Sequence, residues 1–255
     1  MKVLMIGDIV GQPGRKAVRR LLPELKHELG LDMVIANGEN VAGGLGLTPE
    51  TAQELFQDGV DILTGGNHIW DKKEIIPFLD GELPIIRPLN YPPAVPGKGY
   101  LYRNGVLVVN LIGRTFIGNF DDPFRSIDAL LDQFKDKAKV IIVDFHAEAT
   151  SEKCAMGWYL DGRVSVMYGT HTHVPTADAR LLLKGTAYVT DVGMVGPRDS
   201  VIGDNPEDVI QRFLTQMYIR LNVATTGPVR FNSILVDIDD HTGKALSIAR
   251  VDREL

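Results

Sequence analysis

Short runs of apolar, mostly β-branched residues recur along the chain, and each is closed by Gly, Asn, Asp or His. Runs of this length and composition, ended by turn residues, are typical of strands in a folded core. The pattern therefore predicts seven strands. They are Val3–Ile6, Met33–Ala36, Asp61–Thr64, Val106–Leu111, Val140–Phe145, Val164–Tyr168 and Ile234–Ile238.

Helical spacing of apolar residues appears between the early strands. Thr48 before Pro49 has the chemistry of an N-cap with proline in the first turn, and it predicts a helix through about Asp58. The segment KKEIIPFL (72–79) and the amphipathic segment PEDVIQRFLTQMYIRL (206–221) predict two more helices. The first helix is marked by one apolar stripe, formed by Ala17, Val18, Leu21, Leu22, Leu25 and Leu29.

The alternation of strands and helices in the first third predicts parallel strands joined by crossover helices. Later strands come closer together, and Asn104-Gly105, which tolerate positive φ, predict a hairpin. A second hairpin is expected to turn at His241–Gly243. Since 255 residues with 44% apolar content can bury a large core and no linker or repeat interrupts them, we expect one α/β domain over 1–255.

Charge and cysteine content narrow the function. A net charge of −6 without a Lys/Arg cluster argues against binding of long nucleic acid. A small anionic ligand is still compatible with the sequence if bound metal ions supply the positive charge. The single cysteine, Cys154, excludes an intramolecular disulfide and a multi-cysteine zinc site. No apolar segment approaches the length of a membrane span, so we expect a cytoplasmic protein without a membrane partner. The sequence is compatible with a homo-oligomer.

Polar side chains that can bind metals follow five of the predicted strands, at the point where each strand ends. In open α/β sheets, ligands lie in the crevice outside the carboxyl ends of the strands. Four of the six histidines fall at these ends, whereas His27 and His241 fall in a helix and a hairpin turn and receive no role. The residues at the strand ends are Asp8, Asn37, Glu39, Asn40, Asn67, His68, His146, His171 and His173.

The first of these, Asp8, lies in GDIVGQPG (7–14), which allows three interpretations. The glycine spacing departs from a dinucleotide fingerprint, and the carboxylate would occupy the space that an anion needs. Asp8 could instead cap a helix that begins near Pro13 or fix the turn. The full set of polar strand ends favours a metal ligand, exposed by a turn that the glycines permit.

His171 and His173 are two residues apart, so in an extended segment their imidazoles would point the same way and converge on one site. Such a pair alone is weak evidence, but together with His146, Asp8 and Glu39 it favours a metal centre. Oxygen and imidazole ligands without thiolates suit Fe, Mn or Zn better than Ca or Mg. The number of candidate ligands exceeds what one ion can bind, which favours two ions that share a carboxylate over the single zinc ion of a mononuclear hydrolase.

The series GD, GEN, GNH, a lone His after a strand and G-x-H-x-H resembles the calcineurin-like metallophosphoesterases over residues 7–173. The motifs GDIVG, NGEN, GGNHIWD, DFHAE, SEK, YLDGRVS, GTHTHVPTAD and DVGMVG are similar, over nearly the whole chain, to the small bacterial branch regarded as 2',3'-cyclic-nucleotide 2'-phosphodiesterases. The resemblance implies a four-layer α/β/β/α sandwich of metallophosphoesterase type.

The resemblance also implies two ligand sets. Three positions depart from the superfamily pattern: Val10 replaces a histidine of D-x-H, Glu39 replaces the usual bridging aspartate, and Ile69 replaces the acid that orients His68. Asp71 is our candidate for that orienting role. One metal would be bound by Asp8, Glu39, Asn40 and His173, and the other by Glu39, Asn67, His146 and His171.

The expected function is a metal-dependent phosphodiesterase that hydrolyses small phosphodiesters such as 2',3'-cyclic or 3',5'-cyclic nucleotides. Its cofactors would be two divalent or mixed-valence ions, iron first, with manganese or zinc as alternatives. A hydroxide bridging the ions would attack phosphorus, and His68 would protonate the leaving ribose oxygen as general acid.

Three other functions stay open: a phosphomonoesterase, a nuclease for short strands, and a regulatory protein that acts through a partner. Substrate-binding residues are unassigned. Arg198 and Ser200 lie in the loop after DVGMVG, where an arginine could pair with phosphate, but a solvated loop charge is favoured.

Overall fold

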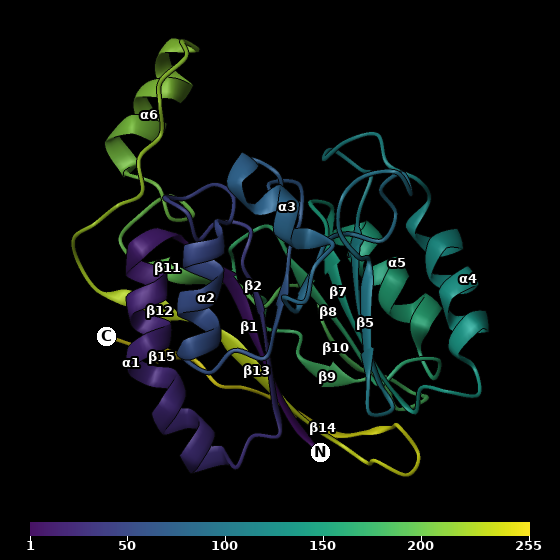
Figure 1. Cartoon of the computed structure of the whole chain (residues 1–255). Helices are drawn as coiled ribbons and strands as arrows, with labels where there is room; N and C mark the ends of the chain where they lie inside the picture. The colour runs from purple at the N-terminus through teal and green to yellow at the C-terminus, as the bar shows by residue number, and fades with distance from the viewer.

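The computed structural model describes residues 1–255, and its two β-sheets face each other with helices on both outer surfaces (Figure 1). The larger sheet has nine strands, with β1 near its centre between β11 and β13 on one side and β2 on the other. Its strands are β1 (Lys2–Ile9), β2 (Met33–Asn37), β3 (Ile62–Thr64), β4 (Ile85–Ile86), β11 (Met194–Pro197), β12 (Val229–Phe231), β13 (Ser233–Ile238), β14 (Ala245–Arg250) and β15 (Arg253–Glu254).

The smaller sheet has six strands in the order β5-β6-β7-β8-β10-β9. These are β5 (Tyr100–Arg103), β6 (Val106–Ile112), β7 (Val140–His146), β8 (Val166–Thr170), β9 (Arg180–Leu181) and β10 (Ala187–Val189). The helices are α1 (Gly11–Leu29), α2 (Pro49–Gln57), a 3₁₀ turn η1 (Lys73–Ile75) leading into α3 (Ile76–Leu79), α4 (Pro123–Phe134), α5 (Thr150–Leu160) and α6 (Pro206–Thr215).

Three separate clusters of buried apolar side chains show that the layers are α/β/β/α. Along β1, Leu4 and Ile6 pack with α1 and α2, while Val3 and Met5 lie in the cluster between the sheets. The third cluster joins the smaller sheet to α4 and α5. Because alternate side chains of a strand point to opposite faces, each sheet contributes to two of these cores. The four-layer sandwich predicted from the sequence is confirmed.

The predicted parallel core and both hairpins are present. Strands β1 to β4 and β6 to β8 are parallel. Asn104 and Gly105 have φ values of 51° and 82° in the turn between antiparallel β5 and β6. Thr48 caps α2 through a reciprocal capping box, with Pro49 in the first turn. No helix combines the length and apolarity needed to cross a lipid bilayer.

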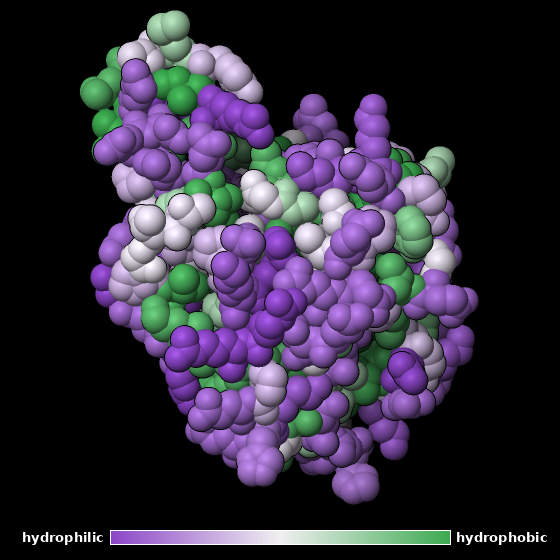
Figure 2. Space-filling view, turned by 60° about the vertical axis from the view of Figure 1, so that its left-hand side comes forward, coloured by the Kyte–Doolittle hydropathy of each residue, from purple (hydrophilic) through white to green (hydrophobic).

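Two helix predictions need correction. The helix expected over 206–221 ends at Thr215, because Gln216 takes the left-handed conformation with φ 55°. α6 projects from the body, and apolar side chains gather on this projection (Figures 1 and 2). The segment 72–79 forms only the short η1 and α3. Helices α4 and α5 were not predicted.

Asp8 lies within a strand, not in a turn or at a helix cap. β1 continues to Ile9, and α1 begins at Gly11 with no side-chain cap. Gly7 is required for a close backbone approach, because a Cβ at this position would overlap the carbonyl oxygen of Gly193. The glycine before Asp8 therefore lets the 191–193 segment pack against β1.

We predict that Gly7→Ala destabilises the protein by about 2 kcal/mol, since the added methyl meets backbone that cannot move without disturbing the sheet. Gly81→Ala is the matched control, because Gly81 is exposed and a Cβ there would lie 3.2 Å from its nearest neighbour, the Phe78 carbonyl oxygen. Urea unfolding of both variants measures the difference. Equal stability of the two variants would contradict the close approach.

Candidate metal centre

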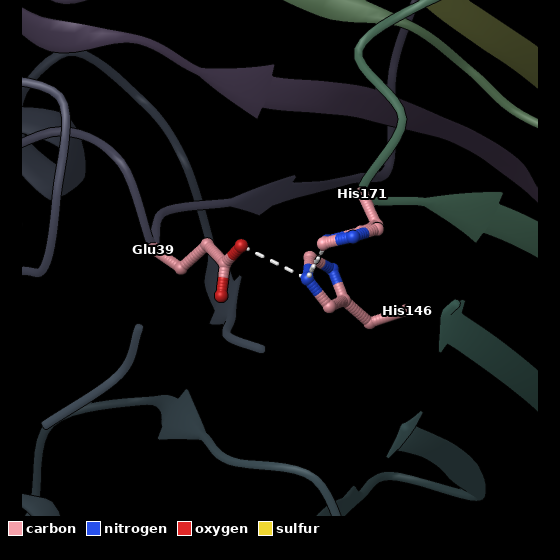
Figure 3. Close-up of side chains that lie close together, drawn as sticks. All are labelled: Glu39, His146 and His171. Atoms are coloured by element: carbon pink, nitrogen blue, oxygen red, sulfur yellow. Dashed lines mark hydrogen bonds and ion pairs between the residues drawn. The ribbon is translucent and has the colours of Figure 1, made fainter. Parts of the chain in front are cut away.

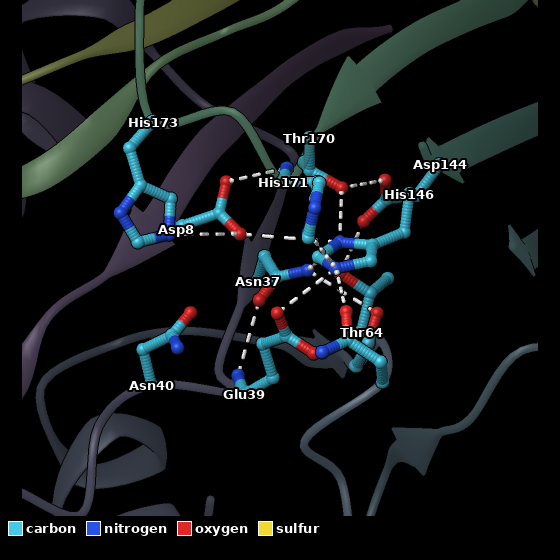
Figure 4. Close-up of polar contacts among 12 residues, drawn as sticks. Asp8, Asn37, Glu39, Asn40, Thr64, Asp144, His146, Thr170, His171 and His173 are labelled. Atoms are coloured by element: carbon cyan, nitrogen blue, oxygen red, sulfur yellow. Dashed lines mark hydrogen bonds and ion pairs between the residues drawn. The ribbon is translucent and has the colours of Figure 1, made fainter. Parts of the chain in front are cut away.

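The carboxyl ends of five parallel strands bring the predicted metal-binding side chains to one place (Figure 4). β1 carries Asp8, and the loop after β2 carries Glu39 and Asn40. Asn67 and His68 follow β3, His146 ends β7, and His171 and His173 follow β8. Thr64 of one sheet donates a hydrogen bond to Asp144 of the other, so the two edges meet directly.

The first group of donor atoms surrounds Nε2 of His146 (Figure 3). This nitrogen lies 2.9 Å from Glu39 Oε1, 3.1 Å from Asn67 Oδ1 and 3.0 Å from His171 Nδ1. A ring nitrogen carries one proton or one lone pair and cannot satisfy three such partners. Donor atoms of Glu39, His146 and His171 all lie within 4.8 Å of one another, which is the spacing of a candidate metal site.

The opposite nitrogen of His146 fixes the orientation of the ring. His146 Nδ1 lies 2.9 Å from Thr170 Oγ1, and that hydroxyl donates to Asp144 Oδ1 at 2.7 Å. Burial raises the pKa of Asp144 to about 7. Metal-binding histidines usually have their second ring nitrogen held by such a partner, because this sets the tautomer and leaves the other nitrogen for the ion.

The second group consists of Asp8, Asn40 and His173. Asp8 Oδ1 and Asn40 Oδ1 are buried oxygens without a hydrogen-bond partner. His173 Nδ1 donates to the Ile202 carbonyl oxygen at 2.6 Å, and its Nε2 lies 3.8 Å from Asp8 Oδ1. Unpartnered buried oxygens are costly, and a cation is one partner that would satisfy such oxygens.

Glu39 and His146 of the first group stabilise each other's charged form. Burial alone would raise the pKa of Glu39, but the neighbouring His146 lowers it to about 2. Burial and the charge of His146 lower the pKa of His171 to about 3. Against its own burial, the contact with Glu39 raises the pKa of His146, so a proton on this ring supplies the positive charge beside the carboxylate. Metal ligands must be deprotonated, so a cation bound here would take the place of that proton.

The surroundings of Asp8, the buried carboxylate of the second group, carry too little positive charge to balance it. Burial raises the pKa of Asp8, although His173 and His146 both act to lower it. A cation beside Asp8 would stabilise its ionised form, as opposite charges do for carboxylates. The donor set of the second group therefore also fits a metal ion.

The extended conformation predicted for His171–His173 is wrong. β8 ends at Thr170, and His171 and His173 have φ values of 98° and 64°. Their side chains consequently do not share one partner. His171 faces His146 and also lies 3.1 Å from Glu148 Oε2, while His173 faces Asp8 (Figure 4).

His68 lies at the rim of the site with its side chain 31% exposed. Its Nδ1 lies 2.7 Å from Asp71 Oδ2, so the predicted contact with Asp71 is present. Its backbone N–H donates to Glu39 Oε2 at 3.0 Å. Ile69, which takes the place of the usual acid, is fully buried in the core beneath α1 and α2.

The polar residues around the ligands were largely missed by sequence reasoning. Thr64, Asp144 and Thr170 are ordinary strand residues in the sequence, and only their burial identifies them. Arg198 pairs with Asp199 at 2.8 Å and Glu254 at 2.7 Å, in keeping with the favoured loop charge. The Ser200 hydroxyl is engaged locally, since it donates to the Pro197 carbonyl.

Residues 4–251 match the family model described as YmdB-like protein. The chain belongs to the YmdB-like family. It is 49% identical over 255 residues to the 2',3'-cyclic-nucleotide 2'-phosphodiesterase of Bacillus subtilis, a match that covers 98% of this chain and 96% of the relative. The predicted resemblance to this bacterial branch is confirmed.

Two solved structures share the YmdB-like fold. A hypothetical protein from Thermus thermophilus has a TM-score of 0.93 and 45% identity, covering 100% of this chain and 99% of the other. A novel phosphatase from Mycoplasma pneumoniae has a TM-score of 0.93 and 34% identity, covering 100% and 93%. The sandwich is therefore of the metallophosphoesterase type.

We predict that Gly66→Ala abolishes metal binding at the first group while the protein stays folded. A Cβ at this position would overlap Glu39 Oε2 and His146 Nε2, so the methyl would fill the space between the donors. Gly38→Ala is the matched control, because its methyl would meet only the ends of the Leu63 and Leu47 side chains, none nearer than 3.2 Å. Metal per chain, measured by mass spectrometry after loading with Mn²⁺, should fall only in Gly66→Ala, and equal loading of both variants would refute the site.

Proposed function

We propose that this chain hydrolyses small phosphodiesters, with 2',3'-cyclic nucleotides as its substrates, at a centre of two metal ions. The observation that carries the proposal is the pair of donor groups at one sheet edge, one around His146 Nε2 and one around Asp8 Oδ1. The name of the Bacillus subtilis relative supports the choice of substrate. The match over 4–251 supports our proposal that residues 1–255 form one domain.

Glu39 is the residue that can serve both ions. Its Oε1 belongs to the first group, and its charge acts on Asp8 of the second group, where it adds to the burial that raises the pKa of Asp8. In our proposal Glu39 would help to hold both ions. One set is Asp8, Glu39, Asn40 and His173, and the other is Glu39, Asn67, His146 and His171.

These donors are oxygens and imidazole nitrogens, a set that suits iron, manganese or zinc. Two such ions, when bound, supply a water-derived nucleophile at neutral pH and neutralise charge on the phosphoryl oxygens. The protein therefore needs no nucleophilic side chain. Its own residues have to orient the ligands and to protonate the leaving oxygen.

His68 is proposed as the general acid. Asp71 holds Nδ1, which leaves Nε2 as the nitrogen that can give its proton to the departing ribose oxygen. Breaking the bond between phosphorus and O2' leaves a nucleoside 3'-phosphate once O2' takes that proton. The partly exposed position of His68 at the rim allows substrate to reach it.

The proposal is tested by counting metals per chain and measuring hydrolysis of 2',3'-cyclic AMP, 3',5'-cyclic AMP, a short single strand and p-nitrophenyl phosphate. We expect about two ions per chain and a clear preference for the 2',3'-cyclic diester. Preference for the monoester or the strand would replace the proposed substrate. Two bound ions without any hydrolysis would favour a regulatory protein.

We predict that His68→Ala lowers kcat on 2',3'-cyclic AMP about 100-fold or more with metal content unchanged, because the general acid is lost. Its backbone N–H, which holds Glu39, is retained in the variant. Asp71→Asn should lower kcat less, because the amide can still accept from His68. The matched control, His241→Ala, removes an exposed histidine and should leave kcat unchanged.

The identity of the leaving group separates proton donation from substrate binding. On bis(p-nitrophenyl) phosphate, whose leaving group needs no proton, the defect of His68→Ala should shrink to about tenfold or less. An equal defect on both substrates would exclude general-acid catalysis by His68.

A further inference from the structure

Lys153 of α5 is completely buried, and its Nζ lies 2.6 Å from Asp191 Oδ2. Both side chains are 1% exposed. An ion pair removed from water in this way gives little stability beyond what an apolar pair of similar volume would give. The stability of the fold therefore does not explain this ion pair, which indicates a role in the neighbouring site.

Asp191 accepts four hydrogen bonds, which connect three segments of the chain. Its Oδ2 accepts from Lys153 Nζ, from the Thr172 backbone N–H at 3.2 Å and from Thr172 Oγ1 at 2.8 Å. Its Oδ1 accepts from the backbone N–H of Gly193 at 2.8 Å. The Gly193 carbonyl in turn accepts from the backbone N–H of Asp8 at 3.0 Å.

Thr172 is the residue between the two histidines with left-handed backbone. Residues with a Cβ adopt positive φ at a cost, and they keep it only where surrounding contacts enforce it. His171 and His173 both do so, with Thr172 bound to Asp191 through its amide and its hydroxyl. This turn is what sends the two imidazoles to different groups of donors.

We propose that Asp191, held in place by Lys153, is a positioning residue that fixes the Thr172 turn and the neighbouring Asp8 strand. It thereby sets His171 against Glu39 and His146, and His173 against Asp8. The inference rests on the proposed function only in taking these residues as metal ligands. It gives a role to SEK and DVGMVG, two of the motifs in the sequence that the catalytic proposal does not use.

Thr172→Val tests the proposal with little change in volume, because it removes one hydrogen bond to Asp191 and leaves Lys153 paired. We expect the affinity for Mn²⁺, measured by calorimetric titration, to fall about 10-fold or more, as for other residues that orient metal ligands. Thr172→Ser keeps the hydroxyl, so its affinity for Mn²⁺ should equal that of the wild-type protein.

Thr186→Val is the matched control. Like the Thr172 hydroxyl, which donates to Asp191 and accepts from the Val174 backbone N–H at 3.5 Å, the Thr186 hydroxyl makes two hydrogen bonds. It accepts from the backbone N–H of Gly162 and donates to the carbonyl of Val164. Thr186 lies just before β10, and the first residue of β10 pairs with the amino end of β8. His171 follows the other end of β8, so Thr186 lies away from the metal site. The control should lower the unfolding temperature without changing Mn²⁺ affinity.

A second readout is independent of metal and separates this inference from the proposed function. In chelator-treated protein, the imidazole NMR signals of His171 and His173 should shift in Thr172→Val, while those of His27 and His241 should not. Asp191→Asn should shift the same two signals further if it folds. Unchanged signals in Thr172→Val, or wild-type affinity for Mn²⁺ in that variant, would overturn the positioning role even if the enzyme proved to be a phosphodiesterase.

Discussion

Two buried carboxylates, those of Asp8 and Glu39, lie where the edges of the two sheets meet, and their desolvation is the constraint on which the site depends. A buried carboxylate is stable only with positive charge or hydrogen-bond donors beside it. Glu39 has His146 and the backbone of His68, whereas Oδ1 of Asp8 has no hydrogen-bond partner. The imidazoles of the site therefore do not balance both carboxylates, and a bound cation would complete that balance.

The sequence was informative where the physics is local. β-Branched runs located the central strands, and Thr48-Pro49 and Asn104-Gly105 located a cap and a turn through their own backbone preferences. Because the carboxyl ends of parallel strands share an edge, the polar residues that follow them could be placed together without coordinates. Features set by distant contacts escaped prediction. Gly7 looks like a turn residue in the sequence, but it is required by Gly193, which is far away along the chain.

Contacts between residues that are distant in the sequence also accompany two of the departures from the superfamily pattern, those at Ile69 and Glu39. Ile69 belongs to the apolar core, and Asp71, one turn further on, contacts His68 in place of an acid directly after it. Glu39, one methylene longer than the usual aspartate, reaches both His146 and the His68 backbone. The bend at His171–His173 could not be inferred from H-x-H spacing, because it depends on Asp191 and Lys153, which lie on other elements.

The central claim is that two ions bind side by side among these ligands, with Glu39 shared. Anomalous X-ray diffraction from crystals grown with Mn²⁺ tests it most directly, because each ion gives its own peak. Our account predicts two peaks about 3.5–4 Å apart, one beside His146 and His171 and the other beside Asp8 and His173. A single peak beside His146, or peaks that leave Asp8 and Asn40 without a cation, would contradict it.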